Sequence, residues 1–141
     1  MLSFVKLALV EKGEDVSTDE RNLLSVACKN LINSKRTARR TVIAVETNPK
    51  YADFLPSLQE YKQSMESHIR DDCRMIVELV TDNVLSKSST KEESRVFFAK
   101  MAGDYYRYQS EVVEGEEKSA AIKNARFSYE EAMQIKLPSC S

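Results

Sequence analysis

The chain has 141 residues, of which 42% are apolar and 30% charged, and its formal net charge is −1 at pH 7. This composition is too apolar for a disordered segment, and the length suffices for a single domain over residues 1–141 with a buried core. The near-neutral charge disfavours a general nucleic-acid-binding domain, and only three glycines and three prolines favour long helices over a turn-rich β fold.

The first third of the chain predicts two helices. The first covers Leu2–Lys12, where apolar residues recur at helical spacing, and Gly13 follows as a terminator. The second opens with a capping box, in which Ser17 and Glu20 each satisfy a free backbone donor, and it runs to about Glu46. The apolar stripe of this second helix comprises Leu24, Ala27, Leu31, Ala38, Val42 and Val45.

The rest of the chain predicts three more helices. The third covers about 56–85, and Thr90 with Glu93 forms a second capping box that opens the fourth. Gly115 ends the fourth helix, and the fifth stops before Pro138. Five helices joined by short loops indicate an all-α, antiparallel helical bundle. The expected stripes of the last two helices are Phe97, Met101, Tyr105, Tyr108 and Val112, and then Ile122, Ala125, Tyr129, Ala132 and Met133.

Charge is distributed unevenly along the chain. Residues 21–50 include seven basic side chains and one acidic side chain, a net charge of +6, whereas residues 51–85 have a net charge of −4. A basic segment within a neutral protein favours one focused anion site over general nucleic-acid binding. The run SKRTARR at 34–40 is a single basic cluster, which is weak support for a nucleic-acid partner.

The cysteines and the remaining motifs narrow the class of protein. Cys28, Cys73 and Cys140 are widely spaced and match no metal-ligand pattern, so we expect a reduced compartment, the cytoplasm, with the nucleus as a second location. The apolar start of the chain is too short to cross a bilayer, so no membrane partner is expected. Without a glycine-rich phosphate loop, a ligand cluster or an activated serine, we expect no metal, no cofactor and no enzyme.

Two rows of polar residues each lie along one face of a predicted helix. The row on the second helix consists of Lys29, Asn33, Arg36 and Arg40. The row on the fourth helix consists of Lys100, Asp104, Arg107 and Glu111, with Tyr108 at its edge.

Spacing alone favours the simpler interpretation of these rows, two solvated helix faces with ordinary salt bridges. The alternative is a phosphate pocket. Lys29, Arg36 and Arg107 would converge on a dianion, and the Tyr108 hydroxyl would donate a further hydrogen bond. Acidic side chains beside the arginines would keep them oriented while the pocket is empty. The supporting residues of this pocket are Arg40, Lys100, Asp104 and Glu111.

Two separated stretches resemble segments of the 14-3-3 family of phosphoserine and phosphothreonine adaptors. They are RNLLSVACKN at 21–30, with Cys28 where that family usually has tyrosine, and KMAGDYYRYQSEV at 100–112. The basic residues at 35, 36 and 40, YKQSMESHIRDDC and SYEEAMQI follow in family order and spacing, so the resemblance runs from about Glu11 to Ile135. Arg39 is a departure, because it stands where a tryptophan is usual.

The resemblance implies a fold, a function and a site. The family fold is a bundle of nine antiparallel helices that forms a cupped dimer with an amphipathic groove in each subunit. Carried over position by position, Lys29, Arg36, Arg107 and Tyr108 match the residues that grip the target phosphate. The expected function is that of a phosphopeptide-binding adaptor in signal transduction, whose partners are phosphorylated client proteins.

The resemblance also implies differences from the family. The chain begins within the family's second helix and ends after its sixth, so the first helix and the last three are expected to be missing. Loss of half the groove would lower affinity and selectivity, and uncovered apolar faces would favour a homo-oligomer with a non-standard interface. The alternative function is a phosphate-independent helical protein–protein scaffold or oligomerisation module.

Overall fold

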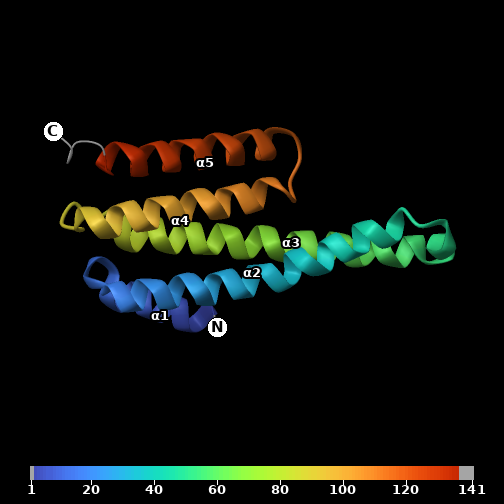
Figure 1. Ribbon diagram of the computed structural model, residues 1–141, viewed down its shortest axis with the longest axis horizontal. Helices are drawn as coiled ribbons and strands as arrows, with labels where there is room; N and C mark the ends of the chain where they lie inside the picture. The colour runs from blue at the N-terminus through green and yellow to red at the C-terminus, as the bar shows by residue number, and fades with distance from the viewer. Residues whose placement is uncertain (1, 137–141) are drawn as a thin grey trace.

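The computed structural model describes residues 2–136, and this part of the chain forms five α-helices and no strand (Figure 1). The predicted all-α, antiparallel bundle is therefore confirmed. Pro138 and Cys140, which entered the sequence analysis, lie outside the described residues. The helices are α1 (Leu2–Lys12), α2 (Thr18–Glu46), α3 (Leu55–Val80), α4 (Glu92–Ser110) and α5 (Gly115–Lys136).

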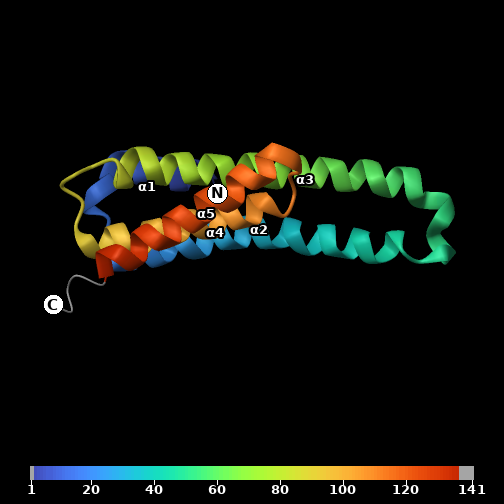
Figure 2. The ribbon, with the colours of Figure 1, turned by 90° about the horizontal axis from the view of Figure 1, so that it is seen from above.

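The two longest helices, α2 and α3, form the frame of the molecule. They pack against each other as an antiparallel hairpin, and the end of this hairpin extends well beyond α4 and α5 (Figures 1 and 2). The helix α4 packs on α3, and α5 packs in turn on α4. Since α2 and α4 both pack on α3, they run in the same direction, and their polar rows can face one another.

Local signals set the first helix boundaries as the sequence predicts. The Ser17 hydroxyl accepts from the Glu20 backbone amide at 3.2 Å, and the Glu20 carboxylate accepts from the Ser17 amide at 3.2 Å, which confirms the first capping box. Gly13 follows α1 with φ +43°, and a Cβ there would lie 2.7 Å from the carbonyl oxygen of Asn83. The turn therefore needs glycine for both its backbone angle and its close approach.

The second capping box, predicted at Thr90 and Glu93, is wrong. The helix α4 begins at Glu92, and no side chain caps its first turn. Thr90 is buried, and its hydroxyl donates to the carbonyl of Val84 at 2.7 Å, while the Glu93 carboxylate pairs with Arg21 at 2.8 Å. Both side chains have other partners: Thr90 satisfies a carbonyl six residues earlier, and Glu93 pairs with the buried guanidinium of Arg21.

The third helix keeps its predicted extent but changes its pitch. Its α-helical part covers Leu55–Val80, and Thr81–Leu85 continues it as a π-helical turn. A short 3-10 helix at Pro49–Phe54 precedes it and forms the end of the hairpin. The prediction of a helix over about 56–85 is thus confirmed, with one widened turn at its C-terminal end.

The hydrophobic core lies between α1, α2, α3 and α4. Both described cysteines are inside it, and burial raises the pKa of the Cys28 thiol to about 12 and that of the Cys73 thiol to about 12. These thiols are therefore protonated and act as small apolar side chains. The other large side chains that are fully buried are Val5, Leu9, Leu24, Ile32, Ile69, Ile76, Val80, Val84 and Phe98.

Beyond this core, ion pairs join the far part of the α2–α3 hairpin. Arg39 donates to Glu66 at 2.8 Å, and Lys62 lies 2.9 Å from Glu46. Lys35 also pairs with Asp72, closer to the core. The basic stretch of α2 is thus set against the acidic stretch of α3, which accounts for the uneven charge along the chain.

Small residues allow α5 to approach α4 closely. A Cβ on Gly103 of α4 would lie 2.7 Å from a ring carbon of Tyr129. The buried positions of α5 are Ala121, Ala125, Ser128 and Ala132. The predicted stripe of α5 is therefore partly wrong: Ile122 is 44% exposed and Met133 61% exposed, because small side chains form the contact with α4.

We expect Gly103→Ala to lower the free energy of unfolding by about 1–2 kcal/mol, since the added methyl group displaces the Tyr129 ring and this cost exceeds the gain in helix propensity. Urea denaturation measures the change. Ser34→Ala, at an exposed position of α2, is the control and gains helix propensity alone. If Gly103→Ala is as stable as the wild type, the α4–α5 contact is looser than described.

Candidate functional site

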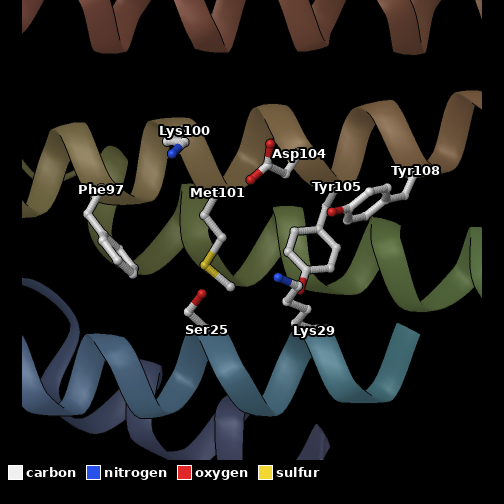
Figure 3. A pocket seen from close by; sticks show the side chains of 8 residues that line it. All are labelled: Ser25, Lys29, Phe97, Lys100, Met101, Asp104, Tyr105 and Tyr108. Carbon is white, nitrogen blue, oxygen red and sulfur yellow. The ribbon is translucent and has the colours of Figure 1, made fainter. Parts of the chain in front are cut away.

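A pocket of about 190 Å³ lies between α2 and α4. From α2, Ser25 and Lys29 reach toward α4, and the opposite wall carries aromatic and charged side chains of α4 (Figure 3). We call this hollow the α2–α4 pocket. Its lining residues are Ser25, Lys29, Phe97, Lys100, Met101, Asp104, Tyr105 and Tyr108.

Arg36 closes one end of the α2–α4 pocket. Its Nε and one Nη donate to the two carboxylate oxygens of Glu111, each at 3.0 Å, so the pair is bidentate. The Arg36 guanidinium also lies over the ring of Tyr108, with its carbon 4.2 Å from the ring centroid. These contacts hold the Arg36 guanidinium at the edge of the pocket. Its remaining N–H groups do not donate to Glu111.

Arg21 bridges the same two helices at the other end of the pocket. Its guanidinium donates to the Ser94 hydroxyl at 3.1 Å and to the Glu93 carboxylate at 2.8 Å, and it lies 5.4 Å from the centroid of the Phe97 ring. The Arg21 side chain is only 6% exposed. Arg21 and Arg36 thus make the same kind of bridge, in which an arginine of α2 contacts an aromatic ring of α4 and a glutamate in α4 or at its C-terminal cap.

Arg107, also on α4, lies near the ring of Tyr108. Its guanidinium carbon is 5.2 Å from the centroid of the Tyr108 ring, and its side chain is 58% exposed. Its nearest carboxylate oxygen belongs to Asp104, at 4.0 Å, the weak limit of an ion pair. Arg107 therefore presents a largely uncompensated cation beside the pocket.

Asp104 is oriented by α5 rather than by Arg107 alone. The Tyr129 hydroxyl donates to an Asp104 carboxylate oxygen at 2.5 Å. Burial and this hydrogen bond both raise the pKa of Tyr129, so its hydroxyl stays protonated and remains a donor. Because Asp104 accepts from Tyr129, its charge is only partly available to neutralise Arg107.

The structure brings together most of the residues that the sequence placed in a site. Four of them line the α2–α4 pocket. Of three more, two arginines contact the Tyr108 ring, and a glutamate pairs with one of these arginines. Arg40, predicted as a supporting residue, is exposed one turn beyond Arg36, and no contact joins it to the described pocket residues. The four in the pocket are Lys29, Lys100, Asp104 and Tyr108; the other three are Arg36, Arg107 and Glu111.

Sequence reasoning missed three contributions to this site. Arg21 was counted only as one charge of a basic segment, yet it bridges α2 to α4. Tyr129 was assigned to an apolar stripe, although its hydroxyl holds Asp104. Tyr108 was expected to act through its hydroxyl, whereas its ring also contacts two guanidinium groups. None of these roles follows from spacing along one helix.

The electrostatics of the site favour an anion. Four cationic side chains and two carboxylates belong to it, and the carboxylates are engaged by Tyr129 and Arg36. A phosphate monoester carries about −1.5 to −2 charges and three acceptor oxygens at neutral pH. Exposed lysines, arginine forks and a phenol hydroxyl are the donors that suit such a group.

Two further observations on residues 2–136 concern metal ligands and membrane-spanning helices. Among the side chains described there, histidine, cysteine and carboxylate groups form no cluster of three or more that could hold a metal ion. The same part of the chain contains no helix long and apolar enough to cross a membrane.

Comparison with known proteins gives consistent matches along the whole chain. The model of the 14-3-3 protein family matches residues 1–141. The 14-3-3 protein beta/alpha of Gallus gallus is 38% identical over 129 residues, which cover 91% of this chain and 52% of that protein. The 14-3-3 protein theta of Mus musculus is 39% identical over 129 residues, with the same 91% and 52% coverage. The chain thus spans about half the length of the curated relatives it matches.

A double-mutant cycle on Arg36 and Glu111 should give a coupling free energy of about 1 kcal/mol. The two side chains of a bidentate pair stacked on an aromatic ring stabilise each other more than those of an ordinary surface pair. Urea denaturation of Arg36→Gln, Glu111→Gln and the double variant measures it. The more exposed pair of Arg74 and Glu117, at 3.3 Å, is the control and should couple near zero. Equal coupling in the two cycles would contradict the bridge.

Proposed function

The chain belongs to the 14-3-3 family, and on that basis we propose that it binds phosphoserine and phosphothreonine peptides at the α2–α4 pocket. In this proposal it is a non-enzymatic adaptor in signal transduction, whose partners are phosphorylated client proteins. The observation that carries the proposal is the meeting of Arg36 and Arg107 over the single ring of Tyr108, beside Lys29.

The phosphate would be bound by donors from both helices. Arg36 offers the N–H groups that Glu111 does not use, and Arg107 offers a guanidinium more than half exposed. Lys29 reaches across the pocket from α2, and the Tyr108 hydroxyl adds a neutral donor. Each charge-assisted hydrogen bond contributes about 1.5–3 kcal/mol, so several together suffice to hold a phosphopeptide.

Two features of the empty site support pre-organisation for this ligand. Glu111 and Tyr108 restrain the Arg36 side chain, which is 17% exposed, so little rotamer entropy remains to be lost when a phosphate binds. Asp104, restrained by Tyr129, lies beside Arg107 without forming a close pair. Arg36 is therefore restrained in position before the ligand binds, and Arg107 is not neutralised by a close carboxylate.

A second candidate function is favoured by a different surface. Four large apolar side chains on α1 and α2 are more than half exposed, and some of them border a hollow of about 230 Å³ between these helices. Such a surface is typical of protein–protein contact, so a phosphate-independent scaffold that associates with itself is the alternative. The four side chains are Leu7, Val10, Leu23 and Val26.

Fluorescence anisotropy tests the proposed function directly. We expect a labelled phosphoserine peptide to bind the 141-residue chain, and its unphosphorylated twin to bind at least tenfold more weakly, since the phosphate supplies the charge that the site recognises. The Arg36→Glu/Arg107→Glu variant should lose the preference for the phosphorylated peptide.

The matched control is Arg70→Glu/Arg74→Glu, which makes the same change of charge at exposed positions of α3. Circular dichroism confirms that each variant remains helical. If both peptides bind equally well, or if the control loses as much affinity as the site variant, the phosphopeptide proposal fails. Equal binding of both peptides would favour the scaffold.

Glu111→Gln gives a further prediction about the same site. We expect it to tighten phosphopeptide binding about threefold to tenfold, because a carboxylate near the dianion is removed and Arg36 regains two donors. The same anisotropy titration measures the effect, with Glu114→Gln as an exposed control of equal charge change. Weaker binding would instead mean that Glu111 acts mainly by holding Arg36 in position.

A further inference from the structure

A second hollow, of about 320 Å³, lies between α4 and α5 and shares Arg107 with the candidate phosphate site. We call it the α4–α5 hollow. Ile122, Met133 and Ala125 of α5 line it, together with Tyr129, whose hydroxyl holds Asp104 of the α2–α4 pocket. The α4–α5 hollow is therefore next to the candidate phosphate site: Arg107 lines it and lies 5.2 Å from the Tyr108 ring centroid, and Tyr129 connects it to Asp104.

The apolar lining of the α4–α5 hollow is not needed to hold α5 in place. Small residues make the buried contact of α5, whereas Ile122 is 44% exposed and Met133 is 61% exposed. Two large aliphatic side chains thus remain accessible beside a cationic site. An accessible apolar floor next to fixed charges is the usual composition of a specificity subsite.

The charges at the rim of the hollow indicate what chemistry it complements. Arg107 and Arg126 both border it, with Glu130 as the acidic neighbour. Arg107 has only the weak contact with Asp104, and no ion pair of Arg126 is found within the described part of the chain. The surface therefore suits a ligand that carries an anion and, next to it, a large apolar group.

We propose that the α4–α5 hollow receives a large apolar side chain that flanks the phosphorylated residue of a bound peptide. This inference rests on the proposed function, because the phosphate is what brings the peptide to Arg107. An extended peptide rises about 3.3 Å per residue, so a side chain one or two positions from the phosphoresidue lies about 3–7 Å further along. That reach matches a hollow that begins at the phosphate-binding arginine itself.

The size of the hollow agrees with one side chain as the occupant. Pockets that enclose whole small-molecule ligands have volumes of about 300–1,000 Å³, and this one is at the low end of that range. A leucine, isoleucine or methionine would bury part of its side chain against Ile122 and Met133. Partial burial of the three additional carbons of leucine relative to alanine corresponds to a roughly tenfold gain in affinity.

The test compares peptides that differ only beside the phosphoserine. Anisotropy titrations use a leucine-flanked peptide, an alanine-flanked peptide and the unphosphorylated form of each, all with the 141-residue chain. The site variant is Ile122→Gln/Met133→Gln, two changes at accessible positions that preserve helix propensity. The control is Phe127→Gln, which changes a 66% exposed apolar residue of α5 that lines a different hollow.

We expect the leucine-flanked phosphopeptide to bind roughly tenfold more tightly than its alanine twin. The preference should fall to less than threefold in the Ile122→Gln/Met133→Gln variant and stay unchanged in Phe127→Gln. The alanine-flanked phosphopeptide should bind all three proteins alike, because its phosphate contacts are untouched.

Other outcomes overturn the inference in distinguishable ways. If both phosphopeptides bind the wild type equally and phosphate is still required, the proposed function stands and the apolar subsite is wrong. If phosphate makes no difference to any peptide, the proposed function and the inference both fail. The remaining case is that a second copy of this chain occupies the hollow, and sedimentation velocity at the titration concentrations tests it. A shift toward monomer in Ile122→Gln/Met133→Gln, but not in Phe127→Gln, would assign the hollow to that second copy and overturn the inference.

Discussion

Two arginine bridges between α2 and α4 are the constraint on which the candidate site depends. Arg21 and Arg36 each place a guanidinium near an aromatic ring of α4 and on a glutamate, which is Glu93 of α4 for Arg21 and Glu111, just beyond the end of α4, for Arg36. The two helices each pack on α3, so these side chains set the separation between their polar rows. The pocket lies between the two hydrogen-bonded bridges, and the hydrophobic core lies beneath it.

The same bridges decide where positive charge is available. Arg21 is paired with Glu93 of α4 and Arg36 with Glu111 just beyond α4. Two more basic residues of α2, Lys35 and Arg39, are paired with α3. Lys29 lies between the bridges and faces the pocket (Figure 3). Four of the seven basic residues in segment 21–50 are thus paired, and Lys29 is the basic residue of that segment that lines the pocket, where the proposed anion site needs a cation.

The helices and their first boundaries could be predicted because their causes are local. The capping box of Ser17, the terminator Gly13 and the period of the apolar residues act within a few positions along the chain. The errors occur where a partner outside the helix competes for a group that helical spacing assigns. Thr90 donates to the carbonyl of Val84 instead of capping α4, and small side chains of α5 form its buried contact while Ile122 and Met133 stay exposed.

The sequence by itself determined that the chain is a bundle of helices, and that Lys29 with Arg36, and Asp104 with Arg107, share faces of two of them. Periodicity specifies a face, since it depends only on the pitch of one helix. It does not specify what that face meets. Only the tertiary structure decided that Arg36 is bound by Glu111, a residue 75 positions away, and that Tyr129 of α5 holds Asp104. Those contacts exist because packing on α3 brings distant helices together, and that information is not present in any single stretch of the chain.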